Sequence, residues 1–194
     1  MSGAGFILDL GRCVGCGACV LACRLENHRP DEAAWRRVLS LNRSHYPGGP
    51  TYYLSLACHH CARPACLAAC PSGAYEKRED GAVLLNQQRC LGCRYCEMAC
   101  PFGAPAYDQA AGVMTKCDLC ATRLDRGLLP ACVAACPTEA LGFKRAGDEE
   151  GAPQRAPAPG FSDPANCSPN VSFVMPRGRI RSLRLTKLQE VLKK

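Results

Sequence analysis

The chain has 194 residues, of which 17 are cysteine and only 6% are aromatic, and its formal charge is +7 at neutral pH. This length suits one ordinary domain or two small ones, and a core so poor in aromatic side chains needs a further source of stability, such as bound metal. No stretch reaches the roughly 18 consecutive apolar residues that span a bilayer, and no signal segment opens the chain, so we expect a soluble or membrane-peripheral protein.

The sequence predicts short, scattered elements rather than long helices or strands. Two strand patterns separated by the Pro- and Gly-rich residues 46–50 predict an antiparallel hairpin. In chain order we expect a strand at 6–10, a helical turn at 20–22, the hairpin strands at 35–41 and 51–57, a helical turn at 67–69, a strand at 82–85 and a helical turn at 133–135.

The last quarter of the chain changes character. Residues 147–170 are rich in Ala and Pro and are expected to form an extended arm. The tail that follows is basic and carries spaced Ile and Leu residues. Three hypotheses stay open for this tail: packing on its own domain, wrapping over a partner subunit, or contact with anionic lipid.

Sixteen of the 17 cysteines fall into four consecutive groups of four. The first and third groups have the spacing C-x2-C-x2-C-x3-C of bacterial ferredoxins. The second and fourth groups widen the middle gap, and the last three groups end in Cys-Pro. The groups are Cys13, Cys16, Cys19 and Cys23; Cys58, Cys61, Cys66 and Cys70; Cys90, Cys93, Cys96 and Cys100; and Cys117, Cys120, Cys132 and Cys136.

This spacing has a physical reason in iron–sulfur chemistry. Three cysteines within seven residues let one tight loop reach three irons of a cubane, while backbone N–H groups point at its sulfides. The fourth thiolate of such a run, just before the proline, ligates the other cluster of a pair because the chain has already turned away. Four groups therefore predict two interlocked pairs of [4Fe–4S] clusters in a protein that transfers electrons.

Two other uses of cysteine fit this pattern less well. Structural zinc typically takes two separated C-x2-C knuckles around one ion. Disulfides need an oxidising compartment, and cysteines only two residues apart suit the Cα separation of a disulfide badly.

Bound clusters also change the charge balance. Each oxidised cubane with four thiolates carries about −2, so four clusters bring the formal charge from +7 to about −1. This balance argues against nucleic acid as a partner.

Four further residues are expected not to be cluster ligands. Cys167 has no group to join and is expected to be a non-ligand thiol. His59 and His60 lie inside the second group, where four cysteines already supply the ligands. Arg94, between two cysteines of the third group, is a candidate for raising the potential of the adjacent cluster, with a plain surface role as the alternative.

Four stretches of the chain carry a resemblance to a known family: FILDLGRCVGCGACVLACR, YYLSLACHHCARPACLAACPSGAYEKREDG, RCLGCRYCEMACPFGAPAY, and MTKCDLC followed by ACVAACP. Through them, residues 5–145 resemble the four-cluster electron-transfer subunit of the dimethyl sulfoxide reductase family. Similar subunits serve polysulfide, tetrathionate and nitrite reductases and formate and sulfite dehydrogenases, so the motifs specify the type of subunit and not the substrate.

The resemblance implies an α+β fold of duplicated bacterial-ferredoxin-like modules, loop-rich, with short strands and helices, a pseudo-twofold relation and an extended C-terminal arm. One module would hold groups one and four in residues 1–57 and 101–146, with a hairpin insertion at about 24–57. The other would hold groups two and three in residues 58–100. Residues 147–194 would form the Pro-rich arm and basic tail.

The same resemblance implies the ligands of each cluster, because in this family group one pairs with group four and group two with group three. The ligand sets are Cys13, Cys16 and Cys19 with Cys136; Cys117, Cys120 and Cys132 with Cys23; Cys58, Cys61 and Cys66 with Cys100; and Cys90, Cys93 and Cys96 with Cys70.

The implied function is electron transfer along four [4Fe–4S] clusters between a large molybdopterin subunit, with molybdenum or tungsten, and a quinone-linked integral membrane anchor. The chain itself is expected to be non-catalytic, since every cluster has four thiolates and no open iron. It would lie at the periphery of the cytoplasmic membrane, on the cytoplasmic side or exported with a partner. The alternative is a free polyferredoxin that shuttles electrons among cytoplasmic oxidoreductases.

Overall fold

The computed structural model describes residues 3–28, 35–41, 51–148 and 166–176. None of the helices in these ranges is long and apolar enough to span a bilayer. The elements in chain order are β1 Gly5–Asp9, α1 Ala18–Glu26, β2 Arg37–Leu41, β3 Tyr52–Leu56, α2 Ala65–Ala68, β4 Tyr75–Lys77, β5 Val83–Leu85, the 3-10 turn η2 Gln87–Arg89, α3 Tyr95–Ala99, β6 Ala106–Asp108, β7 Val113–Thr115, α4 Ala121–Asp125, α5 Ala131–Ala134, β8 Leu141–Lys144 and β9 Val171–Val174.

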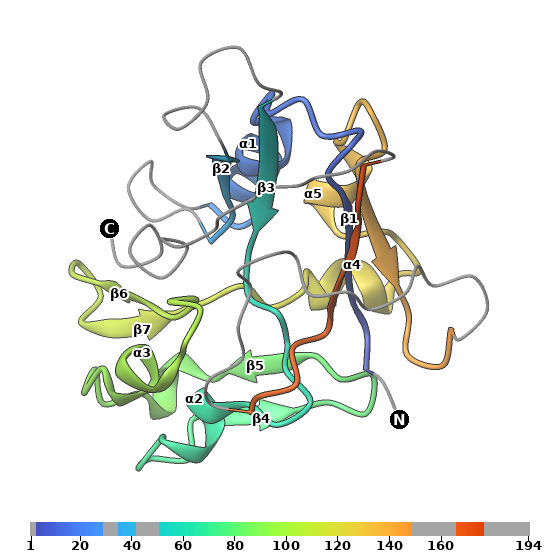
Figure 1. Cartoon of the computed structure of the whole chain (residues 1–194). Coiled ribbons are helices and arrows are strands. Elements are labelled where there is room, and N and C mark those ends of the chain that lie inside the picture. Colours follow the sequence, from blue (N-terminus) through green and yellow to red (C-terminus); the bar gives the residue numbers. More distant parts are fainter. Residues whose placement is uncertain (1–2, 29–34, 42–50, 149–165, 177–194) are drawn as a thin grey trace.

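Four small sheets organise this described part of the chain (Figure 1). The largest has the order β8-β1-β9, with β8 antiparallel and β9 parallel to β1. The others are the antiparallel pairs β2–β3, β4–β5 and β6–β7. The strand before cysteine group one therefore pairs with the strand after group four, and the strand after group two pairs with the strand before group three.

The helices follow the same rule. Helix α1 packs against α5, and α2 packs against α3. Figure 1 shows the first pair in the upper part of the molecule and the second pair at the lower left. Because α1 carries Cys19 and α5 carries Cys132, the first contact brings groups one and four together. Cys66 in α2 and Cys96 in α3 bring groups two and three together.

The predicted hairpin is confirmed, with β2 and β3 paired antiparallel from Arg37 opposite Leu56 to Leu41 opposite Tyr52. Its turn at 46–50 lies outside the described residues. The strands expected at 6–10 and 82–85 correspond to β1 and β5, and the turn at 20–22 lies within α1.

Helices α2 and α5 begin two residues before the helical turns that the sequence predicts at 67–69 and 133–135. Pro64 and Pro130 immediately precede them. A proline suits a helix start because it lacks the N–H that would have no partner there. The earlier start places Cys66 and Cys132 inside the helices.

The core is mainly aliphatic and includes cysteines. Leu8, Leu54 and Leu119 are at most 1% exposed in the larger cluster of buried side chains, which also contains cysteines of groups one and four. A smaller buried cluster combines Val83 and Met114 with cysteines of groups two and three. Packing the core therefore also positions the thiols.

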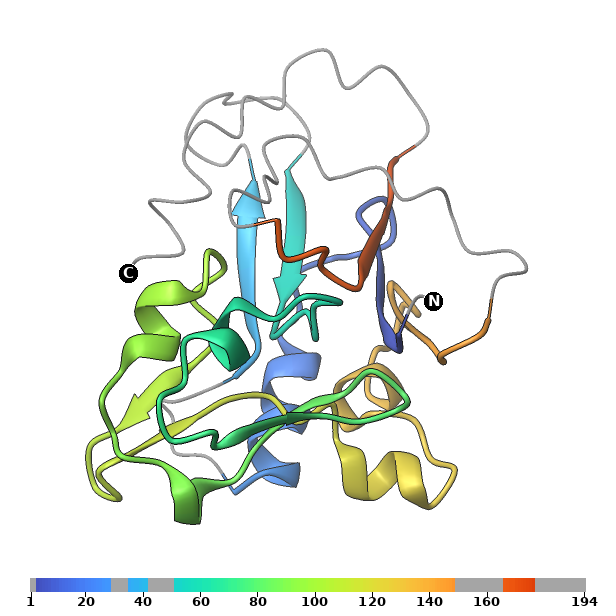
Figure 2. The same cartoon turned by 90° about the horizontal axis from the view of Figure 1, so that it is seen from below.

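Part of the segment expected to form an arm and tail is integrated into the fold. Strand β9 runs beside β1 (Figures 1 and 2). The register places Phe173 opposite Leu8. Just before it, the side-chain amide of Asn170 donates to the carbonyl oxygen of His60 at 2.7 Å. Four strand residues between two prolines give too short a pattern to be predicted. Residues 149–165 and 177–194 lie outside the described ranges, so the rest of the arm and tail stays a prediction.

The junction between β1 and β9 gives a first testable prediction. A Cβ at Gly5 would lie 1.9 Å from the carbonyl oxygen of Asn170, so Gly5→Ala must push these strands apart. Overpacking of this kind costs about 1–3 kcal/mol. In Gly142→Ala, the control on β8, the new Cβ meets Ile7 at an ordinary 3.5 Å. Anaerobic denaturant titration should show a lower free energy of unfolding for Gly5→Ala alone, and equal effects would contradict this packing.

Candidate metal centres

Two hollows in the structure are each lined by cysteines from two different groups. The first is about 380 Å³, open solvent included, and is lined by Cys58, Cys61, Cys66 and Cys100. The second is about 320 Å³ and is lined by Cys13, Cys16, Cys19 and Cys136. In both hollows, three cysteines of one group meet the last cysteine of another group.

The remaining cysteines gather in a similar way, as their influence on each other's pKa indicates. Burial raises the pKa of Cys23 to about 12, with further contributions from the charges of Cys132 and Cys120. Burial likewise raises the pKa of Cys117, and the charge of Cys23 adds to the rise. Four thiols of groups one and four therefore lie near one another.

Cys96 has the corresponding neighbours in groups two and three. Burial raises the pKa of its thiol, and the charges of Cys90 and Cys70 add to that rise. Cys70, the last cysteine of group two, therefore lies among cysteines of group three.

Backbone N–H groups point at several of these sulfur atoms. The amides of Gly92 and Met114 each donate to Cys90 Sγ at 3.4 Å, and the amide of Ala74 donates to Cys70 Sγ at 3.4 Å. Such donors stabilise the negative charge of a thiolate and of a bound cluster. The loop needs glycine at position 92, because its φ is +66° and a Cβ would lie 2.4 Å from the carbonyl oxygen of Gly112.

Burial makes many of these thiols hard to ionise without a bound cation. It raises the pKa of Cys66 to about 12 and that of Cys120 to about 11. Cys70 and Cys136, which precede prolines, behave differently: burial again favours a higher pKa, but hydrogen bonds from neighbouring groups outweigh it and the net pKa is lowered. Iron supplies the positive charge that holds buried cysteines as thiolates.

The geometry of the donors fits a cluster better than a single ion. Zinc binds thiolate ligands at Zn–S distances of about 2.3 Å. Within the described ranges, no three His, Cys, Asp or Glu side chains form a group that could hold one metal ion. In each hollow, the thiols of one cysteine group and the last thiol of another instead line one common space. A [4Fe–4S] cubane, ligated at four corners by cysteine, suits this arrangement.

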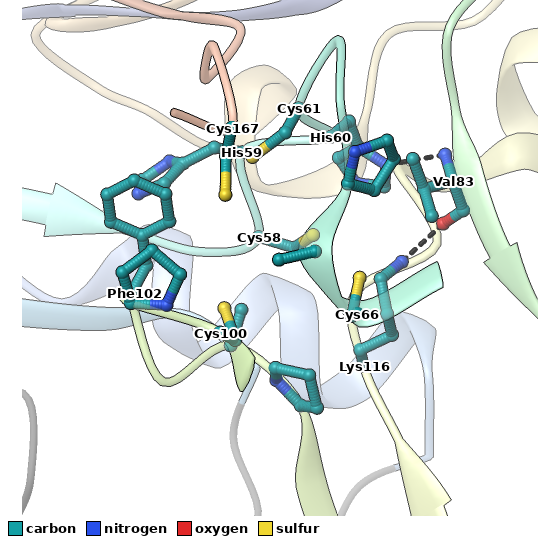
Figure 3. A pocket seen from close by; sticks show the side chains of 15 residues that line it. Cys58, His59, His60, Cys61, Cys66, Val83, Cys100, Phe102, Lys116 and Cys167 are labelled. Carbon is teal, nitrogen blue, oxygen red and sulfur yellow. Dashed lines mark hydrogen bonds between the residues drawn. The ribbon is translucent and has the colours of Figure 1, made fainter. Parts of the chain in front are cut away.

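A fifth cysteine lines the first hollow. Cys167 is 1% exposed, and its sulfur faces the same space as those of Cys58 and Cys100 (Figure 3). Its segment is held there by the backbone, since the amide of Arg63 donates to the carbonyl oxygen of Cys167 at 2.9 Å. No sequence signal predicts this position, because Cys167 belongs to no spacing motif and reaches the hollow only through tertiary packing.

Two buried histidines close the same hollow. Burial lowers the pKa of His59 to about 3 and that of His60 well below its ordinary value, so both rings are neutral at pH 7. His60 Nδ1 accepts a hydrogen bond from the amide of Val83 at 2.9 Å. Beside it, buried Lys116 donates to the carbonyl oxygen of Val83 (Figure 3). The same ammonium group donates to the carbonyl oxygen of Cys117 at 2.6 Å. No motif in the sequence marks this lysine as buried.

The described cysteine loops match family models and known proteins. Residues 50–146 match the family described as a 4Fe-4S dicluster domain, and residues 6–25 match the 4Fe-4S binding domain. One component of the anaerobic dimethyl sulfoxide reductase of Escherichia coli (strain K12) is 45% identical over 152 residues, which cover 72% of each chain.

Two further relatives are named as subunits of reductases of other sulfur compounds. The thiosulfate reductase electron transfer subunit of Salmonella typhi is 39% identical over 145 residues, covering 73% of this chain and 76% of the relative. One component of the tetrathionate reductase of Salmonella typhimurium (strain LT2) is 38% identical over 133 residues, covering 67% of this chain and 53% of the relative.

Arg94 allows a test of whether an exposed charge changes the midpoint potential of a nearby cluster. Its side chain is 55% exposed and already pairs with Glu97 at 2.8 Å. Exposed pairs are screened by water, so Arg94→Gln should leave every cluster midpoint potential unchanged. Potentiometric titration followed by electron paramagnetic resonance (EPR) would measure this, and a fall in one potential would show that Arg94 does tune the adjacent cluster.

Proposed function

This protein belongs to the iron–sulfur subunits of the dimethyl sulfoxide reductase family, and from this premise we propose that it carries four [4Fe–4S] clusters arranged as one electron wire. The observation that supports this most directly is the mixed lining of the two hollows, in which three thiols of one group meet the last thiol of another. Interlocked clusters require such an exchange of ligands.

Two ligand sets are those that line the hollows. The others are Cys117, Cys120 and Cys132 with Cys23, and Cys90, Cys93 and Cys96 with Cys70, supported by the mutual effects of their thiols on pKa and by the helix contacts α1–α5 and α2–α3. Groups one and four then form one ferredoxin-like module, and groups two and three form the other.

Nearness between thiols of different sets supports an order for the clusters. Cys19 of the second hollow lies near Cys132, Cys117 lies near Cys58 of the first hollow, and Tyr75 lies near both Cys66 and Cys96. The wire therefore runs from the Cys13 set through the Cys117 set and the Cys58 set to the Cys90 set.

Both ends of this wire reach the surface. Among the 17 cysteines, all of which lie in described ranges, only Cys16 and Cys93 are exposed, and they belong to the two terminal sets. Val14 beside Cys16 is 58% exposed, and Leu91 beside Cys93 is 71% exposed. Apolar side chains at both ends suit lasting contacts with other subunits.

We assign the Cys16 end to a large molybdopterin catalytic subunit and the Cys93 end to a quinone-linked membrane anchor. This arrangement makes the protein a non-catalytic part of an oxidoreductase complex, peripheral to the cytoplasmic membrane. Homology to a component of dimethyl sulfoxide reductase supports the assignment. A free polyferredoxin is the competing function, and it would leave both apolar ends exposed to water.

Anaerobic purification through an affinity tag on this chain distinguishes the two functions. We expect about 16 irons per chain, from four cubanes of four irons each, together with a large subunit that contains molybdenum or tungsten. Mass spectrometry and elemental analysis would measure both. Recovery of the iron-loaded chain alone, without either metal, would instead support the free polyferredoxin.

The two cysteines that face each other across the first hollow provide a matched pair of variants. Cys100→Ala removes a proposed ligand and should lower the iron content and abolish one [4Fe–4S] EPR signal. Cys167→Ala removes the fifth thiol of the same hollow and should keep all four signals, because four cysteines remain for the cluster. Loss of a cluster in Cys167→Ala would identify Cys167 as a ligand.

A further inference from the structure

Arg36 is a buried cation with unused hydrogen-bond donors. It is 1% exposed, and its Nη1 donates to Ser55 Oγ at 3.0 Å, with a longer contact to the Ser55 carbonyl oxygen at 3.4 Å. The guanidinium carbon lies 4.3 Å from the centroid of the Phe6 ring. Among the described residues, Nε and Nη2 have no hydrogen-bond partner. Burying such donors unpaired is costly, so their position calls for an acceptor.

The surroundings of Arg36 point to the acceptor. Ser55, which binds Arg36, lines the second hollow, and its Oγ lies 3.3 Å from Cys19 Sγ. Burial by itself would lower the pKa of Arg36, but the negative charges of four thiols outweigh burial and the net pKa is raised. These thiols are Cys132, Cys117, Cys19 and Cys23, which belong to the first two ligand sets of the wire.

We propose that Arg36 is the countercharge of the first two clusters, and that its Nε–H and Nη2–H groups donate to cluster sulfur and raise both reduction potentials. The inference rests on the proposed function, since it requires clusters in these two ligand sets. Reduction adds an electron to an already negative cluster. A buried cation and N–H···S hydrogen bonds favour that more negative state.

The position between two clusters gives this charge a second consequence. Electrons on neighbouring clusters repel each other more strongly in a protein interior than in water. A fixed cation near thiols of both sets reduces that repulsion. Arg36 therefore makes it easier to reduce one of the two clusters, in the Cys13 set and the Cys117 set, while the other is already reduced. A wire that passes single electrons requires this.

The neighbouring residue shows how a structural arginine differs. Arg37 is only partly buried, and its Nη2 donates to the carbonyl oxygens of Phe102 and Gly103 at 3.1 and 3.2 Å. Its guanidinium holds two backbone segments together. Arg36 instead holds one serine, has two donors without a partner among the described residues, and lies within electrostatic reach of four thiols.

The test is an EPR-monitored redox titration of the cluster-loaded complex. In Arg36→Gln, two of the four potentials should fall by about 59 mV or more, a tenfold change in the reduction equilibrium of a one-electron couple. Arg36→Lys keeps the charge and should recover part of the loss. The control is Arg12→Gln: Arg12 precedes Cys13 in sequence, but it is 52% exposed and pairs with Glu139 at 3.0 Å, so its loss should shift no potential.

Each outcome decides the inference. Unchanged potentials in fully loaded Arg36→Gln, or an equal shift of all four, would overturn it. If Arg36→Gln does not load clusters, pulsed EPR on the wild-type complex with ¹⁵N-arginine decides instead: nitrogen coupling to a reduced cluster supports the hydrogen bonds, and its absence overturns them. Wild-type protein without any [4Fe–4S] signal would overturn the proposed function itself, which separates that failure from a failure of Arg36.

Discussion

The structure depends on bringing buried thiols from distant parts of the chain to common sites. Burial raises the pKa of many of these thiols, so their thiolate forms are disfavoured without a bound cation, which cluster iron would supply. Each hollow joins three thiols of one group to a thiol at least 34 residues away in sequence. A cluster in such a site acts as a cross-link, which compensates for a core that contains few aromatic side chains.

The pairs of cysteine groups that line each hollow are the same pairs that the strands and helices bring together. Strand β1 pairs with β8, and helix α1 packs on α5, where the second hollow combines groups one and four. Strand β4 pairs with β5, and helix α2 packs on α3, where the first hollow combines groups two and three. The short elements act mainly as supports that hold the cysteine loops in place.

Charge inside the protein is arranged around these loops. Arg36 and Lys116 are buried cations near thiols, whereas His59 and His60 are held neutral by burial. Exposed cations such as Arg94 form ordinary surface pairs. A buried charge acts on a cluster through a medium of low dielectric constant, while an exposed one is screened by water and salt. We therefore expect buried cations to affect cluster potentials more strongly than exposed ones.

The sequence by itself determined that the protein binds iron–sulfur clusters and transfers electrons, because cluster ligation imposes local cysteine spacings that no other common use of cysteine shares. It also determined the hairpin of β2 and β3, because two strand patterns flank a segment rich in Pro and Gly. The predicted helical turns at 67–69 and 133–135 missed the starts of α2 and α5, which begin two residues earlier, directly after Pro64 and Pro130. Only the tertiary structure decided that Cys167 lines a hollow, that β9 joins β1, and that Arg36 lies among four thiols. These features arise from contacts between residues far apart in the chain, and such contacts leave no periodic or spaced pattern along it.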